Sequence, residues 1–400
     1  MKMSVESLLV NPSVLRWARE RLNLTPEQVA EESRRLARRY YTPVSEKELI
    51  DWENGKGEPD LAQLETLAEI YVCPVGWFFL DAPPEEKTPI GFRGLVKDPT
   101  ALSASTRRTL ERFLDLARWT VDLLKRMGQT WEVRIRPGEV SPNTAKAEEL
   151  AQEYRQRLGC VDEARSLSDN PREAFHWWRR AVENQGVFCF EMPLDPKEVR
   201  GAFLWLEEFP FILVNHEDAE AATGRIFTLL HEFAHLVSSN EGFACDFHAD
   251  RPEQSPEPFA NRFAACMLLT PDELRHRLEE IGAGTAHRDT WSDRLLDEIR
   301  KPFAVSRDVV AIWLEEIGLA PPGFYERKRE QWQSRRPWGK GGRRPSQKEQ
   351  KMQEIGYSLL SLLVRAAPRA EFSWMDASSV LGMKVDKVEE FLDWARENTS

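Results

Sequence analysis

One stretch of the sequence combines residue types that could perform metal-dependent chemistry. His231 and His235 are four positions apart, and Glu232 follows the first histidine, all inside an apolar run. On an α-helix, such histidines lie about 40° apart around the axis and ~6 Å apart along it, so both imidazoles can point at one ion. Glu232 lies about 100° round the helix, close enough to hold a water molecule on that ion. The spacing therefore predicts two zinc ligands and the general base of a zinc hydrolase.

A catalytic zinc site needs a third protein ligand and leaves its fourth position to water. The third ligand is not a histidine six residues after His235 with a glycine three residues after His235, because Glu241 and Ser238 occupy these positions. Glu257 lies near the start of a second predicted helix, where a carboxylate is a suitable ligand, although the helix dipole alone also favours an acid there. Pro258 disfavours helical conformation at Glu257 and places it at the helix edge. Alternative ligands stand on the intervening loop: Glu241, Asp246, His248 and Glu253.

Three further residues are candidates for assisting the site. Asn261 lies one helical turn after Glu257, where it could orient Glu257 or one of the histidines from outside the ligand set. A hydrolase also needs a donor that stabilises the oxyanion, and the candidates for that role are His216 and Arg225.

Short strands lead into the histidine-bearing helix. β-rich runs occupy 186–190, 202–206 and 211–215, and the last two are joined by a predicted hairpin turn at 207–210. Upstream, the sequence predicts a loop at 90–94 and helices at 105–126, 144–158 and 172–184. His176 lies in the last of these helices and is predicted to pack or cap rather than to bind metal. Further helices are predicted at 291–299 and 305–316.

The N-terminal residues 1–82 have the pattern of a compact bundle of short helices. Capping boxes begin helices at Thr25 and Ser45, and the helix after Ser45 runs through Trp52 to a stop at Asn54 and Gly55. From Asn11 to Leu80, nine Lys and Arg residues are outnumbered by twelve Asp and Glu residues. Since phosphate contacts dominate DNA affinity, any DNA binding requires a local patch, and a protein-binding or dimerising bundle is the alternative. The candidate DNA contacts are Arg34, Arg35, Arg38, Arg39, Ser45 and Lys47.

This bundle resembles the XRE (lambda-repressor-like) helix-turn-helix family. The residues that carry the resemblance are Arg16–Arg19, Leu24–Ala30, Trp52–Lys56, Pro59–Leu61, Leu67–Ala68 and Val75–Leu80. The resemblance implies that the helix starting near Ser45 enters the major groove of double-stranded DNA.

A second resemblance covers roughly residues 86 to 280. The blocks Arg225–His235 and Glu257–Pro271, with Phe92 and Arg93 as a lead-in, resemble the ImmA/IrrE family of metallopeptidases. This resemblance implies zinc held by His231, His235 and Glu257, with Glu232 as general base. It also implies a regulatory protein substrate of the repressor or antitoxin type.

Composition narrows the setting of the protein. The formal net charge of −11 gives no global attraction to nucleic acid. The five cysteines are scattered without a closely spaced pair, which favours a reducing compartment. No apolar run is long enough for a signal peptide or a membrane span. We expect a cytoplasmic protein with no membrane partner, and a homodimer is one interpretation of the helical modules.

The predicted fold class is mainly α with a small β-sheet. The N-terminal domain is expected to be an all-α helix-turn-helix bundle at 1–82, followed by a central α+β zincin-like domain with a helical lead-in at 83–324. A basic linker is predicted at 325–351, where residues 326–351 contain ten Lys and Arg against three Asp and Glu. A small helical domain, resembling a helix-turn-helix, is predicted at 352–400, with helices at 355–366, 374–381 and 386–397.

The sequence therefore predicts a zinc-dependent endopeptidase that acts as a regulator, cleaves a repressor or antitoxin-like protein and contacts DNA. One alternative is a non-proteolytic, DNA-binding transcriptional regulator that uses the metallopeptidase fold to sense a metal or another signal. Another alternative is a protein-interaction scaffold, which the acidic character of the predicted reading helix favours. An intact Glu232 favours the enzyme, because a purely structural zinc site does not require it.

Overall fold

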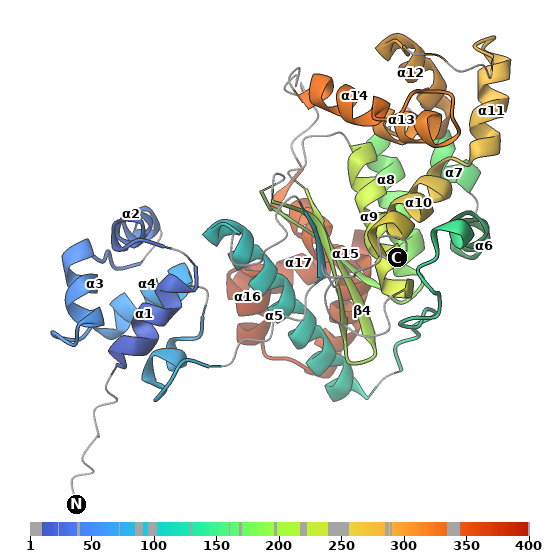
Figure 1. Ribbon diagram of the computed structural model, residues 1–400. Coiled ribbons are helices and arrows are strands. Elements are labelled where there is room, and N and C mark those ends of the chain that lie inside the picture. The colour runs from blue at the N-terminus through green and yellow to red at the C-terminus, as the bar shows by residue number, and fades with distance from the viewer. Residues whose placement is uncertain are drawn as a thin grey trace, which may run out of the picture. The chain divides into compact units, whose positions relative to one another are not determined.

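The chain folds into two compact units in a computed structural model (Figure 1). The first unit contains residues 1–88 and 95–112, and the second contains residues 89–94 and 113–400. The structure describes residues 10–22, 24–37, 41–71, 73–84, 91–94, 102–128, 130–159, 161–167, 170–195, 198–216, 222–238, 256–284, 288, 290–333 and 345–398. In the described part of the chain, no helix is both long and apolar enough to cross a membrane.

The first unit contains the predicted bundle of short helices. Its elements are α1 (Pro12–Glu20), α2 (Pro26–Ala37), α3 (Glu46–Glu53), α4 (Leu61–Tyr71) and the 3-10 helix η1 (Val75–Phe79). The Asn11 side chain caps α1, and Ser45 and Glu48 form a reciprocal capping box at the start of α3. The apolar stripes of these helices meet in one core that includes Leu15, Leu49 and Leu67, so the prediction of an all-α module is confirmed.

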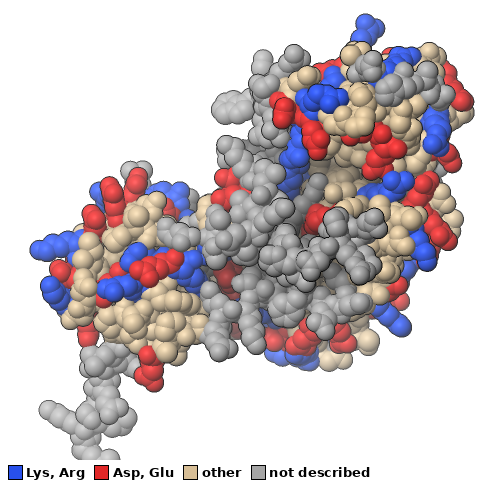
Figure 2. All heavy atoms as spheres, in the orientation of Figure 1, with Lys and Arg blue, Asp and Glu red and all other residues tan. Residues whose placement is uncertain are grey.

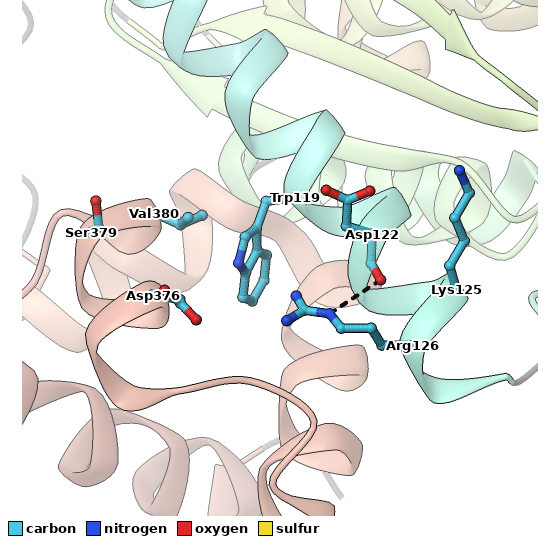
Figure 3. A pocket seen from close by; sticks show the side chains of 7 residues that line it. All are labelled: Trp119, Asp122, Lys125, Arg126, Asp376, Ser379 and Val380. Atoms are coloured by element: carbon cyan, nitrogen blue, oxygen red, sulfur yellow. Dashed lines mark hydrogen bonds between the residues drawn. The ribbon is translucent and has the colours of Figure 1, made fainter. Parts of the chain in front are cut away.

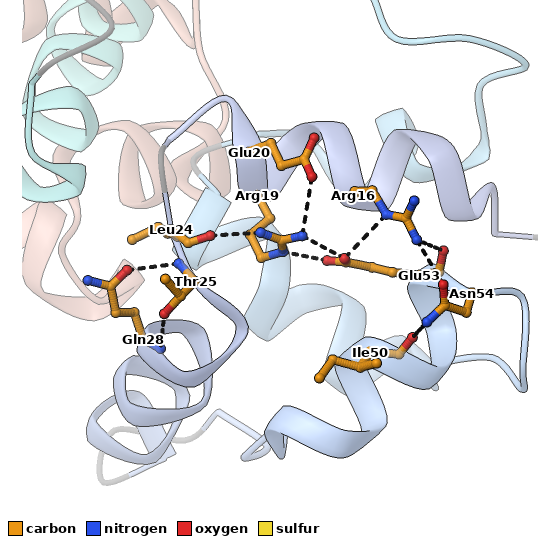
Figure 4. Close-up of polar contacts among 9 residues, drawn as sticks. All are labelled: Arg16, Arg19, Glu20, Leu24, Thr25, Gln28, Ile50, Glu53 and Asn54. Carbon is orange, nitrogen blue, oxygen red and sulfur yellow. Dashed lines mark hydrogen bonds and ion pairs between the residues drawn. The ribbon is translucent and has the colours of Figure 1, made fainter.

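Glu53, at the end of α3, ties this helix to α1 (Figure 4). Its carboxylate accepts hydrogen bonds from Arg19 Nε and Nη2, each at 2.7 Å, in the bidentate geometry that guanidinium groups favour. Arg16 Nη2 donates to the Glu53 backbone oxygen at 2.8 Å, and Arg19 Nη1 donates to Leu24 O at 2.8 Å. Glu53 is 6% exposed, so its carboxylate, next to Trp52 in the chain, is buried in the interior of the bundle.

The second unit is built around a four-stranded sheet with the order β1-β3-β4-β2. Its strands are β1 (Gly91–Gly94), β2 (Phe188–Met192), β3 (Val199–Leu206) and β4 (Phe209–Asn215). The pairs β1/β3 and β3/β4 are antiparallel, whereas β2 and β4 are parallel. The three predicted strands are present, and a mainly α fold with a small sheet is confirmed. The hairpin between β3 and β4 is tighter than predicted, with only residues 207 and 208 between the strands.

The prediction of a loop at 90–94 is wrong, because residues 91–94 form the edge strand β1. Two of its four residues are glycines, which have low β propensity, so the local sequence gives no strand signal. Pairing with β3 in the register Phe92 to Ala202 creates the strand.

Helices cover both faces of the sheet. On one face lies α9 (Ala222–Ser238), which contacts β3 and β4 and also packs against α8 (Pro171–Glu183). On the other face, Phe113 of α5 (Ala104–Met127) makes an edge contact with Phe190, whose ring stacks on Phe211. This order of helix, sheet and helix is visible in Figure 1. Three further helices of the second unit are α6 (Ala147–Leu158), α7 (Val161–Ser166) and α10 (Pro256–Leu268), and 3-10 turns lie at Thr144–Lys146 and Lys301–Phe303.

The residues after α10 differ from the predicted linker and separate C-terminal domain. They contain α11 (Pro271–Glu280), α12 (Asp293–Arg300), α13 (Arg307–Glu316), α14 (Phe324–Gln333), α15 (Gln347–Ala366), a 3-10 turn at Ala367–Arg369, α16 (Trp374–Leu381) and α17 (Val385–Asn398). All of helix α14 after Phe324 falls in the segment predicted as a linker at 325–351. Phe324 is buried, and Lys328 Nζ pairs with Asp293 Oδ1 at 2.7 Å, so this helix is packed on the second unit. Helix α15 packs against β2, so the C-terminal helices belong to the second unit.

A pocket of about 560 Å³ lies between α5 and α16 (Figure 3). Two carboxylates, two cationic side chains and the Trp119 ring line it together with Ser379 and Val380. Lys125 Nζ pairs with Glu207 at 2.6 Å. None of the predicted zinc-site residues lines this pocket.

Candidate metal centre

Helix α9 carries the two histidines and the glutamate of the motif on its buried side. His231, Glu232 and His235 are each at most 1% exposed. The helical spacing brings the imidazoles together, with 3.0 Å between His231 Nε2 and His235 Nε2. One turn of helix thus directs two nitrogen donors at one point, as predicted from the spacing.

Helix α10 supplies a carboxylate to the same point. Glu257 lies in its first turn, with Oε2 at 3.4 Å from His231 Nε2 and Oε1 at 3.2 Å from His235 Nε2. Burial would raise the pKa of Glu257, but the contacts with His231 and His235 outweigh burial and lower it well below its usual range. The Glu257 side chain is 37% exposed, so this carboxylate is the solvent-facing side of the cluster.

The three residues fit a tetrahedral metal ion. Zinc binds imidazole nitrogen and carboxylate oxygen at about 2.0–2.2 Å, which requires donor atoms roughly 3.3 Å apart in a tetrahedron. The separations among the nitrogens and the carboxylate are 3.0, 3.2 and 3.4 Å. His231, His235 and Glu257 also form a cluster able to hold a metal ion, with all candidate donor atoms within 4.8 Å of one another. The alternative ligands Glu241, Asp246, His248 and Glu253 lie outside the described residues.

Strand β3 presents three alternating residues to the motif, none of which was a candidate from the sequence. A Cβ atom on Gly201 would lie 2.8 Å from Glu232 Oε1, so the glycine makes room for the glutamate side chain. The Phe203 ring stacks on the His235 imidazole with 5.1 Å between centroids and 9° between planes. Trp205 Nε1 donates to Leu236 O at 2.9 Å. Residues two apart on a strand share a face, so the sequence held a signal in Gly201, Phe203 and Trp205.

The remaining candidates around the site lie as follows. Asn261 is half-buried on α10, and its side chain makes no hydrogen bond to another residue in the described part of the chain. His216 is exposed at the end of β4. Arg225, in the first turn of α9, donates to Glu191 Oε2 at 3.0 Å and lies over the Phe175 ring. These contacts hold Arg225 toward β2 and α8 rather than toward the histidines.

His176 packs as the sequence predicts. It is half-buried beside the Phe175 ring. Burial lowers the pKa of His176 to about 4, and the charges of Arg179, Arg172 and Arg225 act in the same direction.

The candidate DNA contacts have different surroundings. Arg35 is exposed and pairs with Glu32 at 2.6 Å, and Arg34 Nε donates to Ala30 O within its own helix. Ser45 caps α3, and Lys47 is exposed on that helix. On the face shown in Figure 2, basic and acidic atoms are interspersed over the first unit. Arg38 and Arg39 lie outside the described residues.

Comparisons with known proteins identify two families in this chain. Residues 15–78 match the helix-turn-helix family, and residues 182–315 match a peptidase family described as the IrrE N-terminal-like domain. No curated protein and no solved structure matches the chain. Both resemblances predicted from the sequence are confirmed, and the pairing supports a DNA-binding regulator with a metallopeptidase-like domain. The chain thus contains, in this order, a region that matches the helix-turn-helix family and a region that matches the IrrE N-terminal-like peptidase domain.

Proposed function

We propose that this protein is a zinc-dependent endopeptidase with a regulatory role, which cleaves a repressor or antitoxin-like protein. The observation that supports the proposal is the convergence of His231, His235 and Glu257 beside a buried Glu232. A site that only held a metal for structural reasons would need no additional carboxylate next to the ligands.

In this mechanism, His231, His235 and Glu257 would hold the zinc ion. When bound, zinc supplies Lewis acidity toward a peptide carbonyl and toward water. Glu232 accepts the proton of the attacking water at its carboxylate and delivers it to the amine of the leaving peptide. Gly201 leaves space for the Glu232 side chain, and Phe203 fixes the plane of the His235 ring.

The helix-turn-helix domain would bring this activity to double-stranded DNA. Its reading helix would be α3, with Lys47 on the exposed side. A homodimer would place two such helices on half-sites about one helical turn of DNA apart.

The test of the peptidase compares wild type, Glu232→Gln and His231→Ala in the full chain. Elemental analysis should find about one zinc per chain in the wild type and in Glu232→Gln, and a large loss of zinc in His231→Ala. A library of peptides from a digested proteome, analysed by mass spectrometry, should show new cleavage products with the zinc-loaded wild type only. Cleavage by Glu232→Gln at the wild-type rate, or a wild type that takes up no zinc, would overturn the proposal.

A further inference from the structure

The C-terminal helix α15 is broken in its middle. Gly356 has φ +77° and ψ 170°, outside the helical region, while the residues on both sides are helical. A break of this kind creates a new helix end with carbonyl groups before it and N–H groups after it that lack partners within the helix. Because Ile355, Gly356 and Ser358 are buried and α15 packs against β2, these groups need partners from the rest of the protein.

A pair of charged residues on α8 satisfies both sides of this break. Arg179 donates through Nη1 to Gln353 O, before the break. Glu183 Oε1 accepts the N–H groups of Tyr357 at 3.0 Å and Ser358 at 3.3 Å, after the break. A carboxylate at a helix N-terminus and a cation at a C-terminus are the favoured arrangement.

The same α8 pair continues toward α9. Arg179 Nη1 also donates to Glu191 Oε1 at 2.6 Å, and Glu191 Oε2 accepts from Arg225 Nη1 at 3.0 Å. Arg225 lies in the first turn of α9, upstream of His231 and His235 on the same helix. The ion cluster thus consists of Arg179, Glu183, Glu191 and Arg225, two guanidinium groups and two carboxyl groups.

Three members of the ion cluster are closed to solvent, whereas the side chain of the fourth, Arg225, is 19% exposed. Arg179 is 1% exposed, and the side chains of Glu183 and Glu191 are 3% and 5% exposed. There is also no room at the break, since a Cβ on Gly356 would collide with Cys189 O and with Glu183 and lie 2.5 Å from Arg179 Nη2. Buried charges of this kind depend on every partner, so removing one leaves the others uncompensated.

We propose that the ion cluster couples α15 to the metal-binding helix α9, so that Glu191 and Arg225 are positioning residues for the metal centre. The part of this inference that concerns zinc rests on the proposed function, whereas the mechanical coupling of the two helices does not. Docking of α15 fixes Arg179, Arg179 fixes Glu191, and Glu191 holds the first turn of α9.

The first test compares Gly356→Ala with Gly318→Ala in the full chain. Both glycines have a positive φ, but a Cβ on Gly318 would meet nothing within 4 Å, so this control contains the backbone strain without the collision. Amide hydrogen exchange is measured without metal over α9 and over α13, a helix outside the cluster. We expect Gly356→Ala to raise exchange in α9 roughly threefold to thirtyfold more than in α13. Gly318→Ala should not show this excess.

A second variant acts on the other end of the cluster, in case Gly356→Ala folds poorly. Arg225→Gln should loosen α9 while α15 stays protected, and Arg225→Lys, which keeps the charge beside Glu191, should restore part of the protection. In zinc titrations against a chelator, Gly356→Ala and Arg225→Gln should bind zinc roughly threefold to thirtyfold more weakly than the wild type.

The outcomes separate the two proposals. The coupling would be overturned if Gly356→Ala and Arg225→Gln raised exchange equally in α9 and α13. It would also be overturned if neither variant changed exchange or zinc affinity. In another outcome, the wild type binds no zinc while Gly356→Ala and Arg225→Gln both raise exchange in α9. That result would overturn the proposed peptidase and support the coupling.

Discussion

The two units use their diagnostic residues in opposite ways. In the first unit, Glu53 of the Trp52-Glu53 motif is buried and bound to Arg19, so the motif holds α1 and α3 together. In the second unit, the motif residues His231 and His235 converge on one point with Glu257, and Glu232 is buried on the same helix. Other residues, among them Arg179 and Glu191, hold that part of the fold together.

This difference shows that a family motif can contribute either to the fold or to the function. The contacts of the motif residues in the structure distinguish the two roles. The motif residue Glu53 of the first unit stabilises the bundle, so its presence does not describe the surface that would meet DNA. The match in the second unit includes the residues that would perform the chemistry. Substitutions of motif residues should therefore lower the stability of the first unit. In the second unit, they should lower activity without a matching loss of stability.

The largest effect is expected from Glu53→Ala. It leaves Arg19, whose side chain is 11% exposed, without its bidentate partner, and breaking such a pair costs about 3–5 kcal/mol. Urea unfolding, followed by hydrogen exchange over α1 to α4, should show this loss while zinc uptake by the second unit is unchanged. The exposed Glu58→Ala is the charge-matched control, and a loss no larger than that of the control would contradict the structural role of Glu53.

Gly201→Ala should reduce activity with little effect on metal content. The added Cβ would lie 2.6 Å from Thr228 Cγ2 and 2.8 Å from Glu232 Oε1, so Glu232 must move. A misplacement of this size costs about 100-fold in rate. Cleavage assays and elemental analysis on the same sample measure both quantities. Gly76→Ala, where a Cβ meets nothing within 4 Å, is the control, and equal activity of the two variants would remove Gly201 from the site.

Stability should depend on pH through Glu183. Burial raises the pKa of Glu183 to about 7, although Arg179 and the N–H groups of Ser358 and Tyr357 act in the opposite direction. The folded protein then holds this proton more tightly than the unfolded chain, so the contribution of Glu183 to stability falls as pH rises from about 4.5 to about 7. His176, whose pKa is lowered to about 4 by burial, gives the opposite slope in an overlapping range.

The difference between wild type and Glu183→Gln isolates the Glu183 contribution, because His176 is common to both. Over that pH range, urea unfolding should show the wild type losing on the order of 1–3 kcal/mol relative to the variant. A constant difference would mean that Glu183 stays ionised throughout.

The smallest effect is expected for DNA binding. Lys47→Ala on α3 should weaken binding to duplex DNA of any sequence and reduce the slope of log affinity against log salt by about one. Gel shifts at several salt concentrations measure this slope, with Lys146→Ala in the second unit as the control. Absence of binding by the wild type at about 50 mM salt would instead favour a protein-binding role for the bundle.

The sequence predicts those features that depend on local spacing. The convergence of His231 and His235 follows from one turn of helix, and the capped helices of the first unit follow from Thr25 and Ser45. The strand at 91–94 could not be predicted, because it exists only through pairing with β3. The docking of α15 was likewise missed, since the residues that satisfy its break, Arg179 and Glu183, lie more than 170 positions away in the chain.

Glu257 lies between these two cases. Its suitability as a ligand could be argued from its chemistry, but Pro258 left its position relative to the histidines open. The structure has Pro256, Glu257 and Pro258 in the first turn of α10, where a proline is compatible with a helix. Packing of α10 on α9 then carries the carboxylate to the histidines.

The alternating contacts of β3 with the motif limit how this protein can change over evolution. Gly201, Phe203 and Trp205 meet Glu232, His235 and Leu236 because every second residue of a strand faces the same side. Deletion or insertion of one residue in β3 would turn the wrong side chains toward the site, whereas a change of two residues would restore the alternation. In descendants of this gene, length changes are therefore expected in the surface loops or in even steps along β3.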